Sequence, residues 1–111
     1  MTRPSRLDAA AALALAASLP GWLLADDGRS IYRRFRYSDF SETVDFINRL
    51  AALAHSVDHH PDLKAGYGYC EVLFTTHDAG GLTELDAEGA RAAQELAEQG
   101  HTLPRERPGG D

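Results

Sequence analysis

The chain has 111 residues and a formal net charge of −6 at pH 7, with 43% hydrophobic and 25% charged residues. This composition is typical of a soluble globular protein, and the length suits a single two-layer domain. The acidic balance argues against binding to nucleic-acid phosphates or to an anionic membrane surface. The lone cysteine, Cys70, excludes an internal disulfide and suits a cytoplasmic protein.

The N-terminal segment combines features of a helix and of a signal peptide. Two arginines within residues 1–6 precede an alanine- and leucine-rich run at residues 9–17, an order that secretory signals also have. However, Asp8 interrupts the approach to that run, and no stretch reaches the roughly 18 apolar residues of a membrane span. We therefore predict a helix over residues 8–19, ended by the Pro-Gly pair that follows.

Two predicted hairpins alternate with a long central helix. Residues 22–25 and 31–37 flank the turn signal Asp-Asp-Gly and predict the first hairpin. Residues 63–76 predict the second, which reverses at Tyr67 between two glycines. Between them, a helix is predicted from Asp39 to the proline at position 61. Its apolar residues follow helical spacing and predict one broad buried face, made of Phe40, Val44, Phe46, Ile47, Leu50, Leu53, Ala54 and Val57.

The last predicted helix begins at a capping signature, Thr83 with Asp86 three residues later, and ends at Gly100. We therefore expect one domain over residues 1–100 and a disordered tail over residues 101–111. The order α-β-β-α-β-β-α predicts an α+β fold, with a four-stranded antiparallel sheet and three helices on one face. The other face of the sheet would be uncovered, so we expect dimerisation through that face or through an edge.

Histidines gather where the central helix ends. His55, His59 and His60 lie there, and His77 lies at the end of the last predicted strand. Imidazole groups give and take protons near neutral pH, so the cluster needs an explanation. One interpretation is purely structural, since positive charge is favoured at the C-terminus of a helix.

A zinc site and a metal-free catalytic site are the other two interpretations. His55 and His59 stand four residues apart, as two zinc ligands on one helical face would, and His77 could be a third ligand. No glutamate follows His55 as in H-E-x-x-H, and Cys70 has no partner cysteine. In the metal-free alternative the imidazoles act as general acid and base. Three aspartates could orient them: Asp58, Asp78 and Asp86.

The spacing of these residues resembles the pterin-4a-carbinolamine dehydratase family, also known as the dimerisation cofactor of a homeodomain transcription factor. The resemblance covers roughly residues 7–98. Its central motif is Asp58-His59-His60-Pro61, followed by Tyr67, Thr75-Thr76-His77-Asp78, Gly81-Leu82-Thr83-Glu84 and Asp86. The combination is specific, whereas His-His-Pro alone is not.

This resemblance implies a lyase that dehydrates 4a-hydroxytetrahydropterins to quinonoid dihydropterins in tetrahydropterin recycling. It implies no metal and no organic cofactor, and a homodimer or homotetramer. The catalytic residues it implies are His59, His60 and His77. The substrate-binding residues it implies are Asp58, His59, His60, Thr75, Thr76, His77 and Asp78, supported by His55 and Asp86.

Two positions depart from the family pattern. His55 stands where many members have glutamate, and Leu63 replaces an aromatic residue that is often found there and is a candidate stacking surface for the pterin. A second function is also kept open, that of a non-catalytic binding or assembly module. Some family members assist transcription factors, and dehydratase-like proteins act as RubisCO assembly factors. Those assembly factors tend to have eroded active sites, whereas this chain retains the motif.

Overall fold

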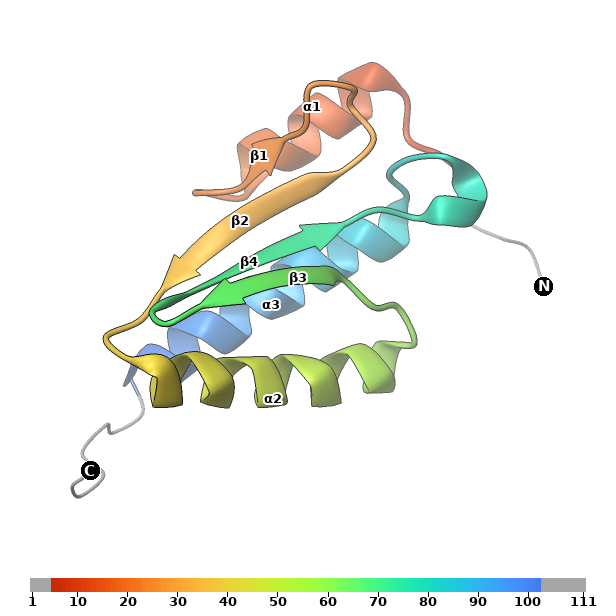
Figure 1. Ribbon diagram of the computed structural model, residues 1–111. Coiled ribbons are helices and arrows are strands. Elements are labelled where there is room, and N and C mark those ends of the chain that lie inside the picture. The colour runs from red at the N-terminus through yellow and green to blue at the C-terminus, as the bar shows by residue number, and fades with distance from the viewer. Residues whose placement is uncertain (1–4, 103–111) are drawn as a thin grey trace.

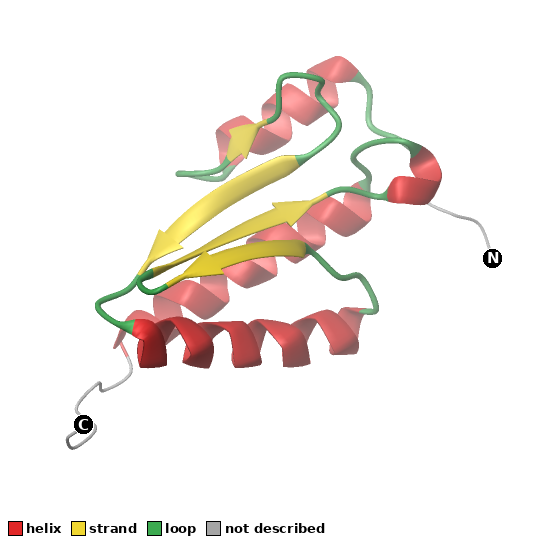
Figure 2. Cartoon of the chain, in the orientation of Figure 1, coloured by secondary structure: helices red, strands yellow, loops and turns green. Residues whose placement is uncertain are grey.

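A computed structural model describes residues 5–102 of the chain (Figure 1). Its elements in order are α1 (Ala9–Ser18), β1 (Leu23–Leu24), β2 (Ile31–Arg36), α2 (Phe40–Val57), β3 (Asp62–Gly66), β4 (Tyr69–Phe74), the short 3-10 helix η1 (His77–Ala79) and α3 (Glu84–Thr102). The four strands form one antiparallel sheet in the order β1-β2-β4-β3. The predicted α+β class and the alternation of hairpins and helices are confirmed (Figure 2).

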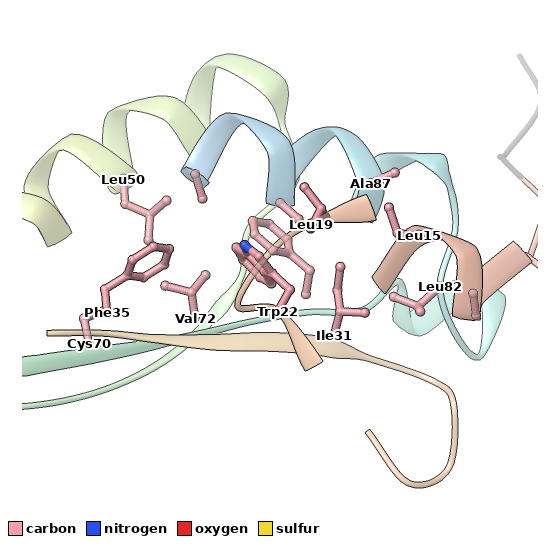
Figure 3. Packing of buried hydrophobic residues seen from close by; sticks show 14 of the residues in the cluster. Leu15, Leu19, Trp22, Ile31, Phe35, Leu50, Cys70, Val72, Leu82 and Ala87 are labelled. Atoms are coloured by element: carbon pink, nitrogen blue, oxygen red, sulfur yellow. The ribbon is translucent and has the colours of Figure 1, made fainter. Parts of the chain in front are cut away.

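The core lies between the sheet and the helices. Alternate residues of β4, namely Cys70, Val72 and Phe74, are buried, as period-2 alternation predicts. Antiparallel pairing places Phe35 opposite Cys70 and Ile31 opposite Phe74, so β2 contributes to the same face. Segments of all three helices cover this face in Figure 3. Burial raises the pKa of the Cys70 thiol to about 11, so this side chain is a neutral core residue at physiological pH.

The opposite face of the sheet carries no helix among the described residues. Strand register aligns Leu23 with Tyr32 and Tyr32 with Leu73 across β1, β2 and β4. Leu23 is 56% exposed on this face. The next row pairs Arg34 with Glu71, whose side chains form an ion pair of 3.2 Å. The prediction of an uncovered sheet face therefore agrees with the structure.

Two helices begin at the aspartates that the sequence indicates. The Asp8 side chain accepts a hydrogen bond of 2.8 Å from the backbone N–H of Ala11 at the start of α1. Asp39 accepts one of 2.9 Å from the N–H of Glu42 at the start of α2. These bonds satisfy backbone donors that have no partner inside the helix. Within residues 5–102, no helix combines the length and the apolar character needed to cross a membrane.

The buried face of α2 is narrower than predicted and is rotated. It consists of Thr43, Phe46, Leu50 and Ala54. The prediction that Phe40, Val44 and Val57 are buried was wrong, because these side chains are 54%, 36% and 39% exposed. Helical spacing admits either stripe, and packing against α3 and the sheet selects the one through Phe46 and Leu50.

The C-terminal helix is longer than predicted. Gly100 does not end α3, which continues to Thr102. A glycine weakens a helix by about 1 kcal/mol relative to alanine without forbidding it, so tertiary context can override this stop signal. Two residues of the predicted tail thus belong to α3, and the remainder, residues 103–111, lies outside the described part of the chain.

Candidate functional site

The end of α2 determines how the histidines are presented. The helix ends at Val57, earlier than the proline signal predicted, because Asp58 adopts the left-handed conformation with φ 56° and ψ 39°. The N–H of Asp58 bonds to the carbonyl of His55, and that of His59 to the carbonyl of Ala54, both at 3.3 Å. This bond pair is a Schellman motif. It turns the chain so that His59 and His60 leave the helix.

His59 is anchored where three elements meet. Its Nε2 lies 2.6 Å from Oδ1 of Asp86, near the start of α3. Its ring stacks on Phe74 at the end of β4, with centroids 6.0 Å apart and planes inclined by 20°. The side chain is 12% exposed, whereas that of Asp86 is fully buried. The fold therefore holds one imidazole against a buried carboxylate near the surface.

Asp86 serves both as a helix cap and as the partner of His59. Its Oδ2 accepts a hydrogen bond of 2.9 Å from the N–H of Thr83, while Oγ1 of Thr83 accepts one of 3.2 Å from the N–H of Leu85. These reciprocal bonds form a capping box, as the sequence signature predicts. Oδ2 also accepts the Thr76 hydroxyl at 2.7 Å. Burial of a carboxylate is costly without hydrogen bonds, and here the two bonds to Oδ2 and the contact of Oδ1 with His59 offset that cost.

His60 and His55 form a second pair, nearer the solvent. Nε2 of His60 lies 3.3 Å from Nδ1 of His55, and both residues are exposed. One of the two nitrogens must accept in such a contact, so at least one of these imidazoles is neutral in this arrangement. His55 therefore meets His60 rather than His59, because His59 is no longer part of the helix.

The zinc interpretation depended on His55, His59 and His77 facing one another. Among the side chains that the structure describes, no group of three or more histidines, cysteines or acidic residues is arranged to hold a metal ion. A spacing of four residues places His55 and His59 on the same face only if both lie in one helix, and α2 ends at Val57, before His59. The proposed three-histidine ligand set is thus not assembled.

The loop after β4 carries the remaining predicted residues. The Thr75 hydroxyl donates to the carbonyl of Arg29 at 2.6 Å and ties this loop to the β1–β2 connection. His77 and Asp78 lie in η1 and are exposed. His77 follows Thr76 directly, so its backbone lies beside the Asp86 network. In the part of the chain that is described, however, its imidazole takes no part in that network.

Two residues that contact members of the candidate site were not recognised as part of it from the sequence. Phe74 was placed in the core, yet its ring also supports His59. Thr83 was read as a helix start, yet its hydroxyl also contacts that of Thr76 at 2.8 Å. The role of Phe74 could have been predicted from strand alternation, because Phe74 and Thr76 are two residues apart and therefore point to the same face.

A separate open groove of about 400 Å³ lies between β2 and α3. It is lined by Arg33, Arg34, Phe35, Arg36, Tyr37, Gln94, Ala97 and Glu98. None of the predicted site residues belongs to this set. Arg33 is already engaged there, since its Nη1 donates to Gln94 at 2.6 Å and to the carbonyl of Pro20 at 3.0 Å. The candidate site is therefore the cluster around His59 rather than this groove.

Comparisons with known proteins show which family the chain belongs to. The family model described as pterin 4 alpha carbinolamine dehydratase matches residues 5–96. A protein of Xanthomonas campestris pv. campestris (strain B100), provisionally named a pterin-4-alpha-carbinolamine dehydratase, is 48% identical over 76% of this chain and 71% of its own length. A Novosphingobium aromaticivorans protein with the same provisional name is 48% identical over 81% of this chain and 94% of its own.

Solved structures show the same fold. A protein from Brucella melitensis, described as a transcriptional coactivator/pterin dehydratase, superimposes with a TM-score of 0.80 at 33% identity, over 84% of this chain and 99% of its own. A pterin dehydratase-like RuBisCO assembly factor of the alpha-carboxysome gives 0.60 at 23% identity, over 69% and 89%, which shows a shared fold alone. The family match, the relatives and the fold agree, and the chain belongs to the pterin 4 alpha carbinolamine dehydratase family.

Proposed function

We propose that this protein is a lyase that dehydrates 4a-hydroxytetrahydropterin to quinonoid dihydropterin in tetrahydropterin recycling. The observation that carries the proposal is the imidazole of His59, held 2.6 Å from the fully buried carboxylate of Asp86. Such a pair orients the ring and stabilises the imidazolium formed when the ring takes up a proton. Membership of the family supports the choice of substrate class.

The reaction needs one base and one acid. The base removes the proton from the ring nitrogen next to carbon 4a, and the electron pair of that N–H bond forms the C=N bond. The acid donates a proton to the 4a-hydroxyl, which leaves as water when its C–O bond breaks. No electrons are gained or lost overall, so the proposal requires neither an oxidant nor a reductant, and it includes no cofactor and no metal.

The exposure and the hydrogen-bond partners of each side chain support the residue roles that we propose. His59 is proposed as the base, because its contact of 2.6 Å with Asp86 holds the ring in one orientation. The exposed His60 and His77 are proposed to supply the acid and to hold the substrate. The same role in substrate binding is proposed for Asp58, Thr75, Thr76 and Asp78, with His55 supporting His60.

The test of function is a turnover assay. Wild-type protein is expected to speed the decay of freshly made 4a-hydroxytetrahydropterin, and His77→Ala to lower that rate by about 10²-fold, since a lost acid or base typically costs this much. The matched control is His101→Ala, at a position that the sequence assigns to no site, and it should retain the wild-type rate. Equal rates for wild type and His77→Ala would contradict the role of His77.

A non-catalytic binding or assembly module is the second candidate. It is favoured by the coactivator description of the Brucella melitensis protein, which shares this fold at 33% identity. Under this alternative the pure protein gives no turnover, and a pull-down returns a protein partner in stoichiometric amount. Turnover by wild type together with its loss in the histidine variants decides for the enzyme.

We also propose a cytoplasmic homodimer or homotetramer. The cytoplasmic location is supported by the single, buried Cys70, which has no partner for an internal disulfide. Assembly is supported by the uncovered sheet face and by strand β3, whose residues 62–65 are all exposed at an edge of the sheet. Light scattering is expected to give two or four times the chain mass of 12.1 kDa. A monomer mass at micromolar concentration would exclude this assembly.

A further inference from the structure

The facing nitrogens of His55 and His60 are separated as two ligands of one tetrahedral metal ion would be. Nδ1 of His55 lies 3.3 Å from Nε2 of His60. Two nitrogens that each bind a tetrahedral zinc ion at about 2.0–2.1 Å are about 3.3–3.4 Å apart. Neighbouring ligands of a square-planar ion at that bond length would be closer, at about 2.9 Å. The observed separation therefore fits tetrahedral zinc better than square-planar copper.

The backbone on both sides of this pair is held in place. His55 lies in the last turn of α2, and the left-handed turn at Asp58 leads the chain out of the helix toward His60. The neighbour of His60 in the sequence, His59, is anchored to the buried Asp86 at 2.6 Å. Little conformational entropy is therefore lost when the two imidazoles close on an ion.

Both imidazoles are available to an ion from solvent. The two residues are exposed, and their rings meet edge to face, with centroids 5.1 Å apart and planes inclined by 71°. Within residues 5–102, neither imidazole has a hydrogen-bonding partner other than the other ring. In a zinc-bound pair the two facing nitrogens are unprotonated, so His55 keeps its proton on Nε2 and His60 keeps its proton on Nδ1. A neutral pair thus binds the ion by a change of tautomer, without a net loss of protons.

We propose that His55 and His60 form a surface zinc site, and that zinc bound there inhibits the protein. In the described part of the chain, no third histidine, cysteine or acidic residue is arranged with them to hold a metal. Water therefore completes the tetrahedron, and binding is reversible. The inhibition rests on the proposed function, in which His60 supplies the acid or holds the substrate. Its Nε2 can neither donate nor accept a proton while that nitrogen binds zinc.

Calorimetric titration of the metal-free full chain with zinc chloride tests the site. In wild type we expect one zinc ion per chain, with a Kd in the micromolar range. His55→Ala and His60→Ala are each expected to raise the Kd by at least about 10- to 100-fold, since the loss of an outer partner of a metal ligand already costs this much. His77→Ala and His101→Ala are the matched controls and should keep the wild-type Kd.

NMR of protein labelled with ¹⁵N-histidine shows which nitrogens bind the ion. On addition of zinc chloride we expect the resonances of Nδ1 of His55 and Nε2 of His60 to shift, and those of His59 to stay. Turnover of 4a-hydroxytetrahydropterin is then measured with and without zinc. Saturating zinc is expected to slow wild type by about 10²-fold, as the loss of an acid would. In His55→Ala the same zinc concentration should leave the rate of that variant unchanged.

The outcomes separate the zinc site from the proposed function. Wild type that binds no zinc, or a His55→Ala variant with the wild-type Kd, overturns the site. Loss of binding in His77→Ala or His101→Ala overturns it as well, because the ion would then lie elsewhere. Zinc binding by the pair without slower turnover overturns the inhibition. Zinc binding by a protein that shows no turnover even without zinc confirms the site and refutes the proposed function.

Discussion

Replacing His59 by alanine is expected to slow dehydration of 4a-hydroxytetrahydropterin by about 10²- to 10⁴-fold, the usual contribution of a positioned acid or base. His59 is the only histidine among the described residues that pairs with a fully buried carboxylate. Its loss removes the proposed proton acceptor while leaving His60 and His77 in place. The rate of substrate decay at saturating substrate measures the effect.

A glutamine at the same position separates chemistry from stability. In His59→Gln, the side-chain amide can donate a hydrogen bond to Asp86 but cannot take up a proton near neutral pH. We expect this variant to be as slow as His59→Ala and to have a free energy of unfolding closer to that of wild type. A His59→Gln protein that kept the wild-type rate would exclude His59 as the base.

The fold could be predicted because its signals are local. Asp8, Asp39 and the Thr83–Asp86 pair mark helix starts through bonds to backbone groups two or three residues away. Alternation in β4 marks the buried face of the sheet in the same local way. Such interactions need no knowledge of the tertiary structure, and the structure contains them as expected.

The errors occurred where packing decides between local alternatives. Phe40 and Val44 fit a helical stripe as well as Phe46 and Leu50 do, and contact with the rest of the fold selects the second pair. The proline at position 61 signals a helix end, but the left-handed conformation of Asp58 ends the helix first. That conformation is uncommon for any residue other than glycine, so sequence spacing gives little warning of it.

The site was predictable as a set of residues but not as a geometry. His59 and Asp86 are 27 residues apart in the sequence. They are in contact because the fold places the start of α3 beside the end of α2. Spacing suggested that His55 and His59 face one another, whereas His55 meets His60. The resemblance supplied the residue set, and the structure supplies the pairing.

Replacing Asp86 by alanine is expected to lower the free energy of unfolding by about 3–5 kcal/mol, since three donors lose their acceptor in or near the protein interior. These donors are the hydroxyl of Thr76, the N–H of Thr83 and Nε2 of His59. The variant should also lose turnover, because His59 is no longer oriented. Urea unfolding monitored by circular dichroism measures the change in stability.

Asp8 provides the matched control, because it also accepts a backbone N–H near the start of a helix. Its single hydrogen bond, of 2.8 Å from the N–H of Ala11, is exposed. Asp8→Ala should therefore lower the free energy of unfolding by about 1 kcal/mol, as expected for an ordinary helix cap. The further decrease in the free energy of unfolding of Asp86→Ala, beyond that of Asp8→Ala, then measures the contribution of the buried hydrogen bonds that join α3 to Thr76 and His59. Equal losses in the two variants would show that Asp86 acts only as a cap, and the proposed anchoring of His59 would fail with it.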